Sequence, residues 1–337
     1  MKRKLKAFVS VIMIMMFTTI MLIGCGEAKD ENITKVRLNE VTRSVFYAPM
    51  YIAISEGFFE ENGIQIDLQT GQGADKVMQA VLSDSADVGF CGPEQVIYIN
   101  IQGREDNPVA FAQLTQKDGT FLVGRTNEEN FNWKQLKGKD IIGGRPGGVP
   151  AMALEYAMKQ NGINPDTDAN MVTNIDFAAT AGAFKGGTGD YVALFEPTAS
   201  VLEKEGTGHI LASVGEESGI IPYTCFFATN SYMKENPEVI QKFTNAIYKG
   251  QQWYFSHTSE EIADSIIEYF PGTERDTIIT VIENYKAIDA LAHEPTIKEK
   301  DLNRLMDIII EYDSSLIPNR PAFNDMVDNS YAEKALK

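Results

Sequence analysis

Short apolar runs alternate with amphipathic segments along almost the whole chain after residue 34. Runs rich in Val, Ile and Phe predict β-strands, and apolar positions at helical spacing predict the helices between them. In the first part of the chain the expected strands are 35–41, 64–69, 86–90 and 108–114, and the expected helices are 48–63, 74–84 and 93–103. Repeated strand–helix–strand units predict an α/β fold with parallel sheets covered by helices on both faces. Ligands of such sheets bind beyond the carboxyl ends of the strands.

A second set of alternating segments follows, with expected strands at 140–144, 170–176, 191–195 and 209–214 and helices at 150–162, 179–186 and 196–206. After one more apolar run, 223–230, the pattern predicts four helices at 237–256, 259–270, 275–287 and 298–312. We expect two doubly wound lobes, with residues 35–118 and 223–337 in lobe 1 and residues 119–222 in lobe 2. Two crossings of the chain between lobes predict a hinge beside a ligand cleft.

The N-terminus has the pattern of a bacterial export signal. Cations occupy four of the first six positions, an uncharged apolar run covers 7–24, and Leu-Ile-Gly precedes Cys25. This order resembles a lipobox and predicts a signal peptide at 1–24, a lipid such as palmitate on Cys25, and a polar tether at 25–34. The alternative is an uncleaved membrane anchor, because the run nearly reaches the ~18–20 residues that a span needs. Both alternatives put the folded part outside the cytoplasm, beside a membrane.

Charge and cysteine content exclude several functions. Removing the four signal cations from the 30 Lys and Arg residues leaves 26 against 47 acids, a net charge of −21. Such a chain does not bind nucleic acid by neutralising phosphates. Two cysteines remain after Cys25, with three histidines and no metal-binding spacing, so we expect neither a metal nor a cofactor. Whether Cys91 and Cys225 pair as a disulfide stays open.

The segment from "RSVFYAPMYIAISEGFFEENG" to "ADVGFCGPE", 43–94, resembles the first lobe of extracytoplasmic solute-binding proteins of ABC importers, in the nitrate, sulfonate, taurine and thiamine-precursor group. The resemblance continues through "LKGKDIIGGRPGGVPAMALEYAMKQNGI", "GTGDYVALFEP" and "NPEVIQKFTNAIYKGQQW". It implies a type II periplasmic-binding fold whose two lobes close over a small molecule. It also implies a monomer that delivers this molecule to a membrane permease and its ATPase.

Two strand ends of lobe 1 supply candidate ligand-binding residues. Phe46 and Tyr47 follow the first strand and could stack on a flat ligand, although Phe46 could equally fill the core. "GFCGPEQ" follows the third strand and contributes Cys91, Gly92 and Glu94. Glu94 could face a ligand or the start of the next helix. Cys91 is interpreted as a wall residue, because no histidine near it in the sequence could serve as its base.

Lobe 2 and the hinge supply the other candidates. The glycine-rich "GGRPGGVP" precedes a predicted helix, so Gly147, Gly148 and Val149 could present backbone amides to a ligand, or simply form a tight turn. Glu196 could accept hydrogen bonds from a ligand or cap the helix after it. Gln116 and Tyr223 flank the two crossings. Arg43 and Arg145 could clamp an anion or lie at the surface.

Two acids and several aromatics favour a small planar or heteroaromatic metabolite as the ligand. A sulfonate or nitrate becomes the better choice if either arginine faces the cleft. A pyrimidine synthase that shares this fold is the enzymatic alternative, but its cysteine-rich motif and active-site histidine have no match in "GFCGPEQ" or "TRSVFYAP". No G-x-S-x-G elbow predicts a hydrolase. A purely structural surface lipoprotein would not need the paired strand ends described above.

Overall fold

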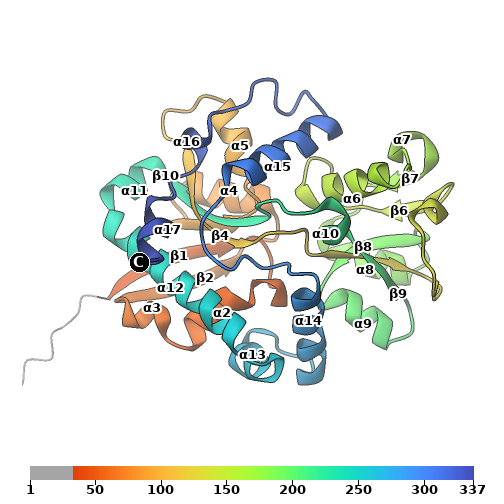
Figure 1. Ribbon diagram of the computed structural model, residues 1–337, viewed down its shortest axis with the longest axis horizontal. Coiled ribbons are helices and arrows are strands. Elements are labelled where there is room, and N and C mark those ends of the chain that lie inside the picture. The colour runs from red at the N-terminus through yellow and green to blue at the C-terminus, as the bar shows by residue number, and fades with distance from the viewer. Residues whose placement is uncertain (1–32) are drawn as a thin grey trace, which may run out of the picture. The chain divides into compact units, whose positions relative to one another are not determined.

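The computed structural model describes residues 33–337, and these contain two five-stranded sheets (Figure 1). The expected signal peptide, the lipidated Cys25 and most of the tether lie outside the described residues. The first sheet has the order β2 (Ile64–Thr70), β1 (Thr34–Glu40), β3 (Val88–Cys91), β10 (Thr224–Thr229) and β4 (Pro108–Thr115). The second has the order β7 (Asn170–Val172), β6 (Asp140–Ile142), β8 (Tyr191–Phe195), β5 (Thr120–Gly124) and β9 (His209–Ser213).

Each sheet is mixed, so the expectation of purely parallel sheets is wrong. In the first sheet β1 pairs in parallel with β2 and β3, but β10 is antiparallel to both β3 and β4. In the second sheet β6 is parallel to β7 and β8, whereas β5 is antiparallel to β8 and β9. The reason is the hinge: β5 and β10 are the strands that begin directly after a crossing, at 116–119 and 219–223. A strand that begins at the hinge runs opposite to strands that end there.

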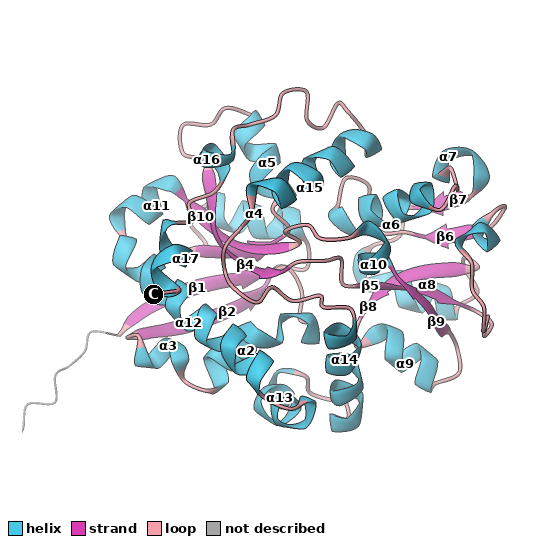
Figure 2. Cartoon of the chain, in the orientation of Figure 1, coloured by secondary structure: helices cyan, strands magenta, loops and turns pink. Residues whose placement is uncertain are grey.

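Helices cover both faces of each sheet (Figure 2). Most of the expected helices are present, although several short ones and β5 were not predicted. The α-helices are α2 (Ala48–Ser55), α3 (Phe58–Glu61), α4 (Ala74–Leu82), α5 (Glu94–Ile101), α6 (Val149–Gln160), α7 (Pro165–Asp168), α8 (Thr180–Lys185), α9 (Thr198–Lys204), α10 (Val214–Ser218), α11 (Asn230–Glu235), α12 (Pro237–Ser256), α13 (Ser259–Ile266), α14 (Arg275–Ala287), α15 (Glu299–Tyr312), α16 (Phe323–Met326) and α17 (Ser330–Ala335). The 3₁₀ turns are η1 (Val45–Tyr47), η2 (Trp133–Leu136), η3 (Phe177–Ala179) and η4 (Ile267–Tyr269).

The single helix expected over 48–63 is two helices, α2 and α3. Gly57 separates them with a φ of 75°, a left-handed conformation that glycine adopts without a steric penalty. Apolar residues continue across the break because six successive residues of α2, 48–53, are buried and α3 buries Phe59. Periodicity alone therefore could not reveal the interruption.

The apolar core is continuous between the two lobes. One buried cluster contains Val36 and Phe90 from the first sheet together with Val192 and Leu194 from the second. A smaller cluster around Trp133, which includes Leu122, Ile141 and Val214, lies within lobe 2. The lobes are therefore packed against each other in this structure, which sets the context for the residues at their boundary.

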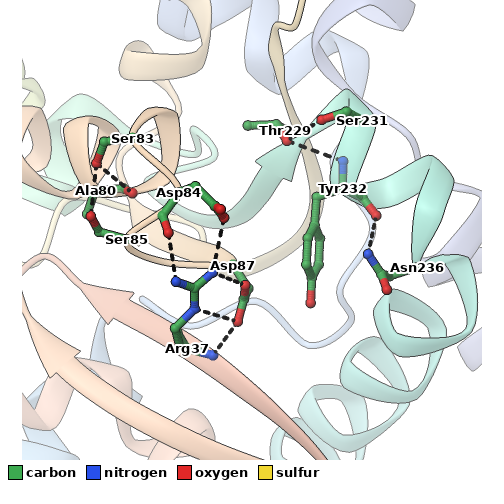
Figure 3. A network of polar contacts seen from close by, with 10 residues as sticks. All are labelled: Arg37, Ala80, Ser83, Asp84, Ser85, Asp87, Thr229, Ser231, Tyr232 and Asn236. Atoms are coloured by element: carbon green, nitrogen blue, oxygen red, sulfur yellow. Dashed lines mark hydrogen bonds and ion pairs between the residues drawn. The ribbon is translucent and has the colours of Figure 1, made fainter.

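An ionic network joins β1 to the loop before β3 (Figure 3). The Arg37 guanidinium donates to both carboxylate oxygens of Asp87, at 3.2 Å and 2.6 Å, and Asp87 also accepts from the Arg37 backbone amide at 2.7 Å. Arg37 further donates to Asp84, whose side chain is 90% exposed, whereas that of Asp87 is 10% exposed. The burial of Asp87 makes its ion pair the stronger of the two.

We expect Asp87→Asn to lower the free energy of unfolding by about 1.5–3 kcal/mol, because the amide cannot accept from the guanidinium at both positions. Asp84→Asn is the matched control and should cost less than about 1 kcal/mol, since that pair is exposed and screened by solvent. Asparagine also tolerates the left-handed backbone of residue 84, where φ is 57°. Urea denaturation of both variants measures the difference, and equal losses would show that Asp87 has no special role.

Candidate functional site

The segment after β1 forms a direct contact between the lobes. Ser44 caps η1 by accepting a hydrogen bond from the Phe46 amide at 3.2 Å, and its hydroxyl donates to the backbone carbonyl of Glu196 at 2.8 Å. Ser44 belongs to lobe 1 and Glu196 follows β8 of lobe 2. The strand ends expected to face one another therefore do meet.

Phe46 lies at the centre of an aromatic cluster at this boundary. Its ring stacks on Tyr285 of α14 at 4.6 Å between centroids and contacts Tyr223 at 5.8 Å and Phe195 at 6.3 Å. Tyr47 continues the cluster to Phe90 of β3, edge to face at 4.7 Å. These rings come from both lobes, the hinge and the C-terminal helices, and all but Phe195 are buried. Phe46 therefore packs between the lobes, and the structure does not require a ligand to explain its burial.

Asp118 of the first crossing is a fully buried acid that sequence reasoning missed. Its Oδ1 accepts from the Thr120 amide at 2.7 Å and from the Thr120 hydroxyl, while its Oδ2 has no hydrogen-bond partner. The Tyr223 hydroxyl lies close enough to lower the pKa of Asp118 slightly, but no hydrogen bond of normal geometry joins the two groups. Burial dominates and raises the pKa of Asp118 to about 6. The position of Asp118 in a predicted crossing between the lobes was the sequence feature that could have identified it.

Glu94, at the start of α5, is the second buried acid. Its carboxylate folds over Gly92, where an added Cβ would lie 2.0 Å from Oε2, so a side chain at residue 92 would displace the Glu94 carboxylate. Oε1 accepts from the Gln95 amide nitrogen at 3.3 Å, and Oε2 has no partner. Burial raises the pKa of Glu94 to about 7, although Gln95 and the charge of Arg145 lower it. An ionised Glu94 is therefore costly in this structure.

We expect Glu94→Gln to stabilise the ligand-free protein by about 2 kcal/mol at pH 8 and to have no such effect at pH 4. Below the ordinary pKa of 4.5 the carboxyl is protonated in both states. As pH rises to the folded-state pKa of about 7, the unfolded chain releases the proton first, so the wild type loses stability. Urea denaturation at pH 4, 6 and 8 measures this. A less stable variant at pH 8 would contradict the expectation.

Cys91 and Cys225 lie directly opposite each other on the antiparallel strands β3 and β10. Both are buried and both are free thiols in this structure. Burial, followed by the charge of Glu94, raises the pKa of each thiol. A thiol that resists ionisation is a poor nucleophile, so this environment gives Cys91 the properties of a wall residue.

The glycine turn of lobe 2 also touches lobe 1. The Tyr98 hydroxyl of α5 donates to the Gly147 carbonyl at 3.1 Å, and Gly147 has a φ of 73°. Gly148 is the N-cap of α6 and Val149 its first residue, buried in the shared core. Beside the turn, half-exposed Arg145 lies 4.0 Å from Asp75 of lobe 1.

Glu196 and Gln116 have protein partners for their side chains. The Glu196 carboxylate accepts from the Ser200 amide and hydroxyl at 2.8 Å and 2.7 Å, and from Asn284 at 2.9 Å. It caps α9 and joins that helix to α14, so both of its oxygens are already engaged. The Gln116 side chain donates to Asp289 at 3.0 Å.

Arg43 is held on lobe 1 by Glu40 and does not meet the aromatic cluster around Phe46. Its Nε donates to Glu40 at 2.7 Å, and its guanidinium lies over the rings of Tyr51 and Tyr269. Arg145 of lobe 2, which lies 4.0 Å from Asp75 of lobe 1, is therefore the arginine nearer to the boundary between the lobes. The structure therefore gathers Phe46, Tyr47 and Tyr223 in one aromatic cluster, and a hydrogen bond from Tyr98 of α5 joins lobe 1 to the glycine turn of lobe 2.

Two features are absent from residues 33–337: a helix able to span a membrane and a metal-binding cluster of side chains. No described helix combines the length and apolar character needed to cross a membrane. The same residues contain no group of three or more His, Cys, Asp or Glu side chains arranged to hold a metal ion.

Two lobes joined by two crossings, with aromatic and acidic side chains gathered between them, define the periplasmic-binding-protein class. The profile of the family described as "NMT1/THI5 like" matches residues 45–261, and the chain belongs to this family. A curated relative, "Putative binding protein YtlA" of Bacillus subtilis (strain 168), is 46% identical over 318 residues that cover 94% of each chain.

Two more distant proteins show the range of this fold. A 4-amino-5-hydroxymethyl-2-methylpyrimidine phosphate synthase of Aspergillus parasiticus is 24% identical over 235 residues, 65% of this chain and 67% of the synthase. The solved ligand-binding component of an ABC-type import system from Staphylococcus aureus, with zinc bound, has a TM-score of 0.69 at 17% identity, covering 90% of this chain and 99% of that one. The structural match shows the shared fold, and the far closer relative is a binding protein by name.

Proposed function

We propose that this protein is the extracytoplasmic solute-binding receptor of an ABC importer, which captures a small molecule between its lobes and hands it to a permease and its ATPase. The observation that carries the proposal is the set of buried, unpartnered oxygens on Glu94, Asp118 and Tyr223 where the lobes meet. Buried polar atoms without partners are rare in folded proteins, and a ligand would satisfy them. The relative with 46% identity supports a binding role.

The surrounding rings favour a small planar or heteroaromatic ligand. The aromatic cluster at the lobe boundary includes Tyr47, Phe90 and Tyr223, and aromatic rings of this kind suit a flat ligand with hydrogen-bond donors on its edge. A nitrate or sulfonate ligand would need a cation, and the nearer arginine, Arg145, is half-exposed beside Asp75. The planar ligand is therefore the better supported of the two classes.

A receptor role is favoured over an enzymatic one. The raised pKa of Cys91 removes the most obvious nucleophile, and the three histidines lie elsewhere: His257 stacks on Trp253, His293 stacks on Phe255, and His209 is on β9. A thermal-shift screen of the purified protein against heterocycles, sulfonates, nitrate and amino acids tests the proposal, because a ligand of the folded state raises the unfolding midpoint. Recovery of the bound compound unchanged supports a receptor, and its conversion would contradict one.

We also propose that a lipid on Cys25 holds the receptor at the outer face of the cell membrane, as a monomer. The support is the sequence pattern alone, an apolar run ending in Leu-Ile-Gly before Cys25. Cys25→Ser should either release the protein from membranes or leave the precursor at full length. Unchanged size together with unchanged membrane association would contradict the lipid anchor.

A further inference from the structure

Cys91 of β3 and Cys225 of β10 occupy the same register position on neighbouring strands of the first sheet. The two strands are antiparallel, and their register continues without a shift over residues 89–91 and 225–227. Directly opposed residues of such a pair have Cα atoms about 4.5–5.5 Å apart. Disulfides span about 4.4–6.8 Å between Cα atoms. The backbone therefore places the two cysteines at a separation that a disulfide can bridge.

The neighbouring register pairs show that the two thiols lie on the same face of the sheet. Phe90 and Phe226 stack on one face, with ring centroids 4.3 Å apart. The ring of Phe227 lies over Gly89, where an added Cβ would be 2.3 Å from the Cζ atom of that ring. The register shifts between β10 and β4 each insert an extra residue in β4, so β10 itself alternates regularly. Because side chains alternate between faces, the two cysteines share the face of Gly89 and Phe227.

The surroundings of the thiols offer little that a bond between them would give up. Both cysteines are 0% exposed. The Cys91 thiol donates to the carbonyls of Ala74 and Gly92 at 3.8 Å and 3.6 Å, and a thiol is a weak donor. Residues 33–337 contain no metal-binding cluster that would require either thiolate. A disulfide would replace two buried thiols with an apolar bridge.

A bond at this position would close lobe 1 covalently. Lobe 1 is built from two stretches of chain, one before the first crossing at 116–119 and one after the second crossing at 219–223. β3 belongs to the first stretch and β10 to the second, so strand pairing and packing hold the stretches together in the sheet. Cys225 is the second residue of β10, directly after the second crossing. The bond would therefore anchor the base of this crossing and leave both crossings free to bend.

We propose that Cys91 and Cys225 form a structural disulfide when the chain folds under oxidising conditions, which fixes the two stretches of lobe 1 to each other beside the hinge. The proposed location outside the cytoplasm supplies such conditions, because disulfides persist there. The oxidant is a disulfide, either of a thiol–disulfide oxidoreductase or of a small thiol. One cysteine thiolate attacks it to form a mixed disulfide, and the other thiolate then displaces the oxidant. The protein pair loses two protons and two electrons, and the oxidant is reduced to two thiol groups.

The reaction takes place before the pair is buried. The thiolate is the reacting species, and burial raises the pKa of both thiols. An external oxidant also cannot reach two side chains that are 0% exposed. The bond therefore forms while β10 docks on β3, and protein that has folded with reduced cysteines stays reduced.

Refolding of the full-length protein decides whether the pair bonds. The protein, in detergent, is unfolded in urea with a reductant and refolded in a mixture of reduced and oxidised glutathione. Free thiols are then alkylated in urea, and the protein is digested with trypsin. Cleavage at the flanking lysine and arginine residues gives peptides 77–104 and 205–234, each with one of the two cysteines. We expect these peptides to be recovered joined, and the intact mass to be lower by two hydrogen atoms.

Three serine variants test the assignment. Cys91→Ser and Cys225→Ser should each abolish the joined peptides, whereas Cys25→Ser is the matched control and should retain them, because Cys25 lies outside both peptides. Oxidised wild type should unfold at a midpoint about 5 °C or more above that of wild type refolded in reductant, because the bond closes a long loop. Cys91→Ser and Cys225→Ser should have the same midpoint in both buffers.

Protein isolated from a bacterium that exports it, with its thiols alkylated before lysis, gives a second measurement, which decides alone if the chain does not refold. Separate recovery of the two peptides in both measurements would overturn the proposal, and equal midpoints of oxidised and reduced wild type would overturn the structural role of the bond. Peptides joined after refolding but separate in the isolated protein would support the bond and contradict the proposed location. The ligand screen decides the receptor function independently, because it does not depend on this bond.

Discussion

Phe46→Ala should lower the free energy of unfolding by about 3–5 kcal/mol, the range for removing a fully buried phenylalanine side chain. Phe46 is 0% exposed and its ring contacts aromatic rings from both lobes, the hinge and α14. The cavity left by alanine would lie between the lobes and could not close by movement of one lobe alone. Urea denaturation measures the loss, and ligand affinity should fall with it.

Phe255→Ala is the control for this substitution. Phe255 is 37% exposed at the end of α12, so its removal should cost less than about 1 kcal/mol. Phe46→Leu keeps most of the apolar volume and should recover part of the loss. If Phe46→Ala were as mild as Phe255→Ala, the aromatic cluster would not be what holds the lobes together.

Gly250→Ala should lower the free energy of unfolding by about 3 kcal/mol or more. This is at or beyond the upper end of the destabilisation caused by overpacking a core. A Cβ at residue 250 of α12 would lie 2.2 Å from the Pro49 carbonyl oxygen and 3.1 Å from the Ala53 Cβ. The clash is with the backbone of α2, so no side-chain rotation relieves it. Because α2 directly follows η1, its displacement would also move Phe46 and Tyr47.

Gly182→Ala provides the matched control within another helix, α8. Nothing lies within 4 Å of the Cβ that it would add, so the higher helix propensity of alanine should make it neutral or stabilising by up to about 1 kcal/mol. Unfolding midpoints of the two alanine variants give the comparison directly. Similar midpoints would show that α12 and α2 can separate without cost.

At the individual site residues, the position of a residue in the fold could be predicted from the sequence, but the partners of its side chain could not. Sequence reasoning named Glu196 for its place after a strand, and the structure does place it at the boundary, but with its carboxylate directed to Ser200 and Asn284. Asp118 was missed although it lies in a predicted crossing, because a single acid in a loop has no periodicity. The role of each in binding stays a prediction, whereas their protein partners are now known.

The sequence by itself determined the class of this fold, because alternating strand and helix periodicities and the turn residues between them are local properties. The matched segments also determined the family. Only the tertiary structure decided that β5 and β10 run antiparallel to their neighbours, that Gly57 divides a helix, and that Cys91 faces Cys225. It alone showed that Asp118, Glu94 and Tyr223 are each buried with an oxygen that has no hydrogen-bond partner. Sheet order and register depend on how distant segments pack across the hinge, and hydrophobic periodicity contains no information about those distances.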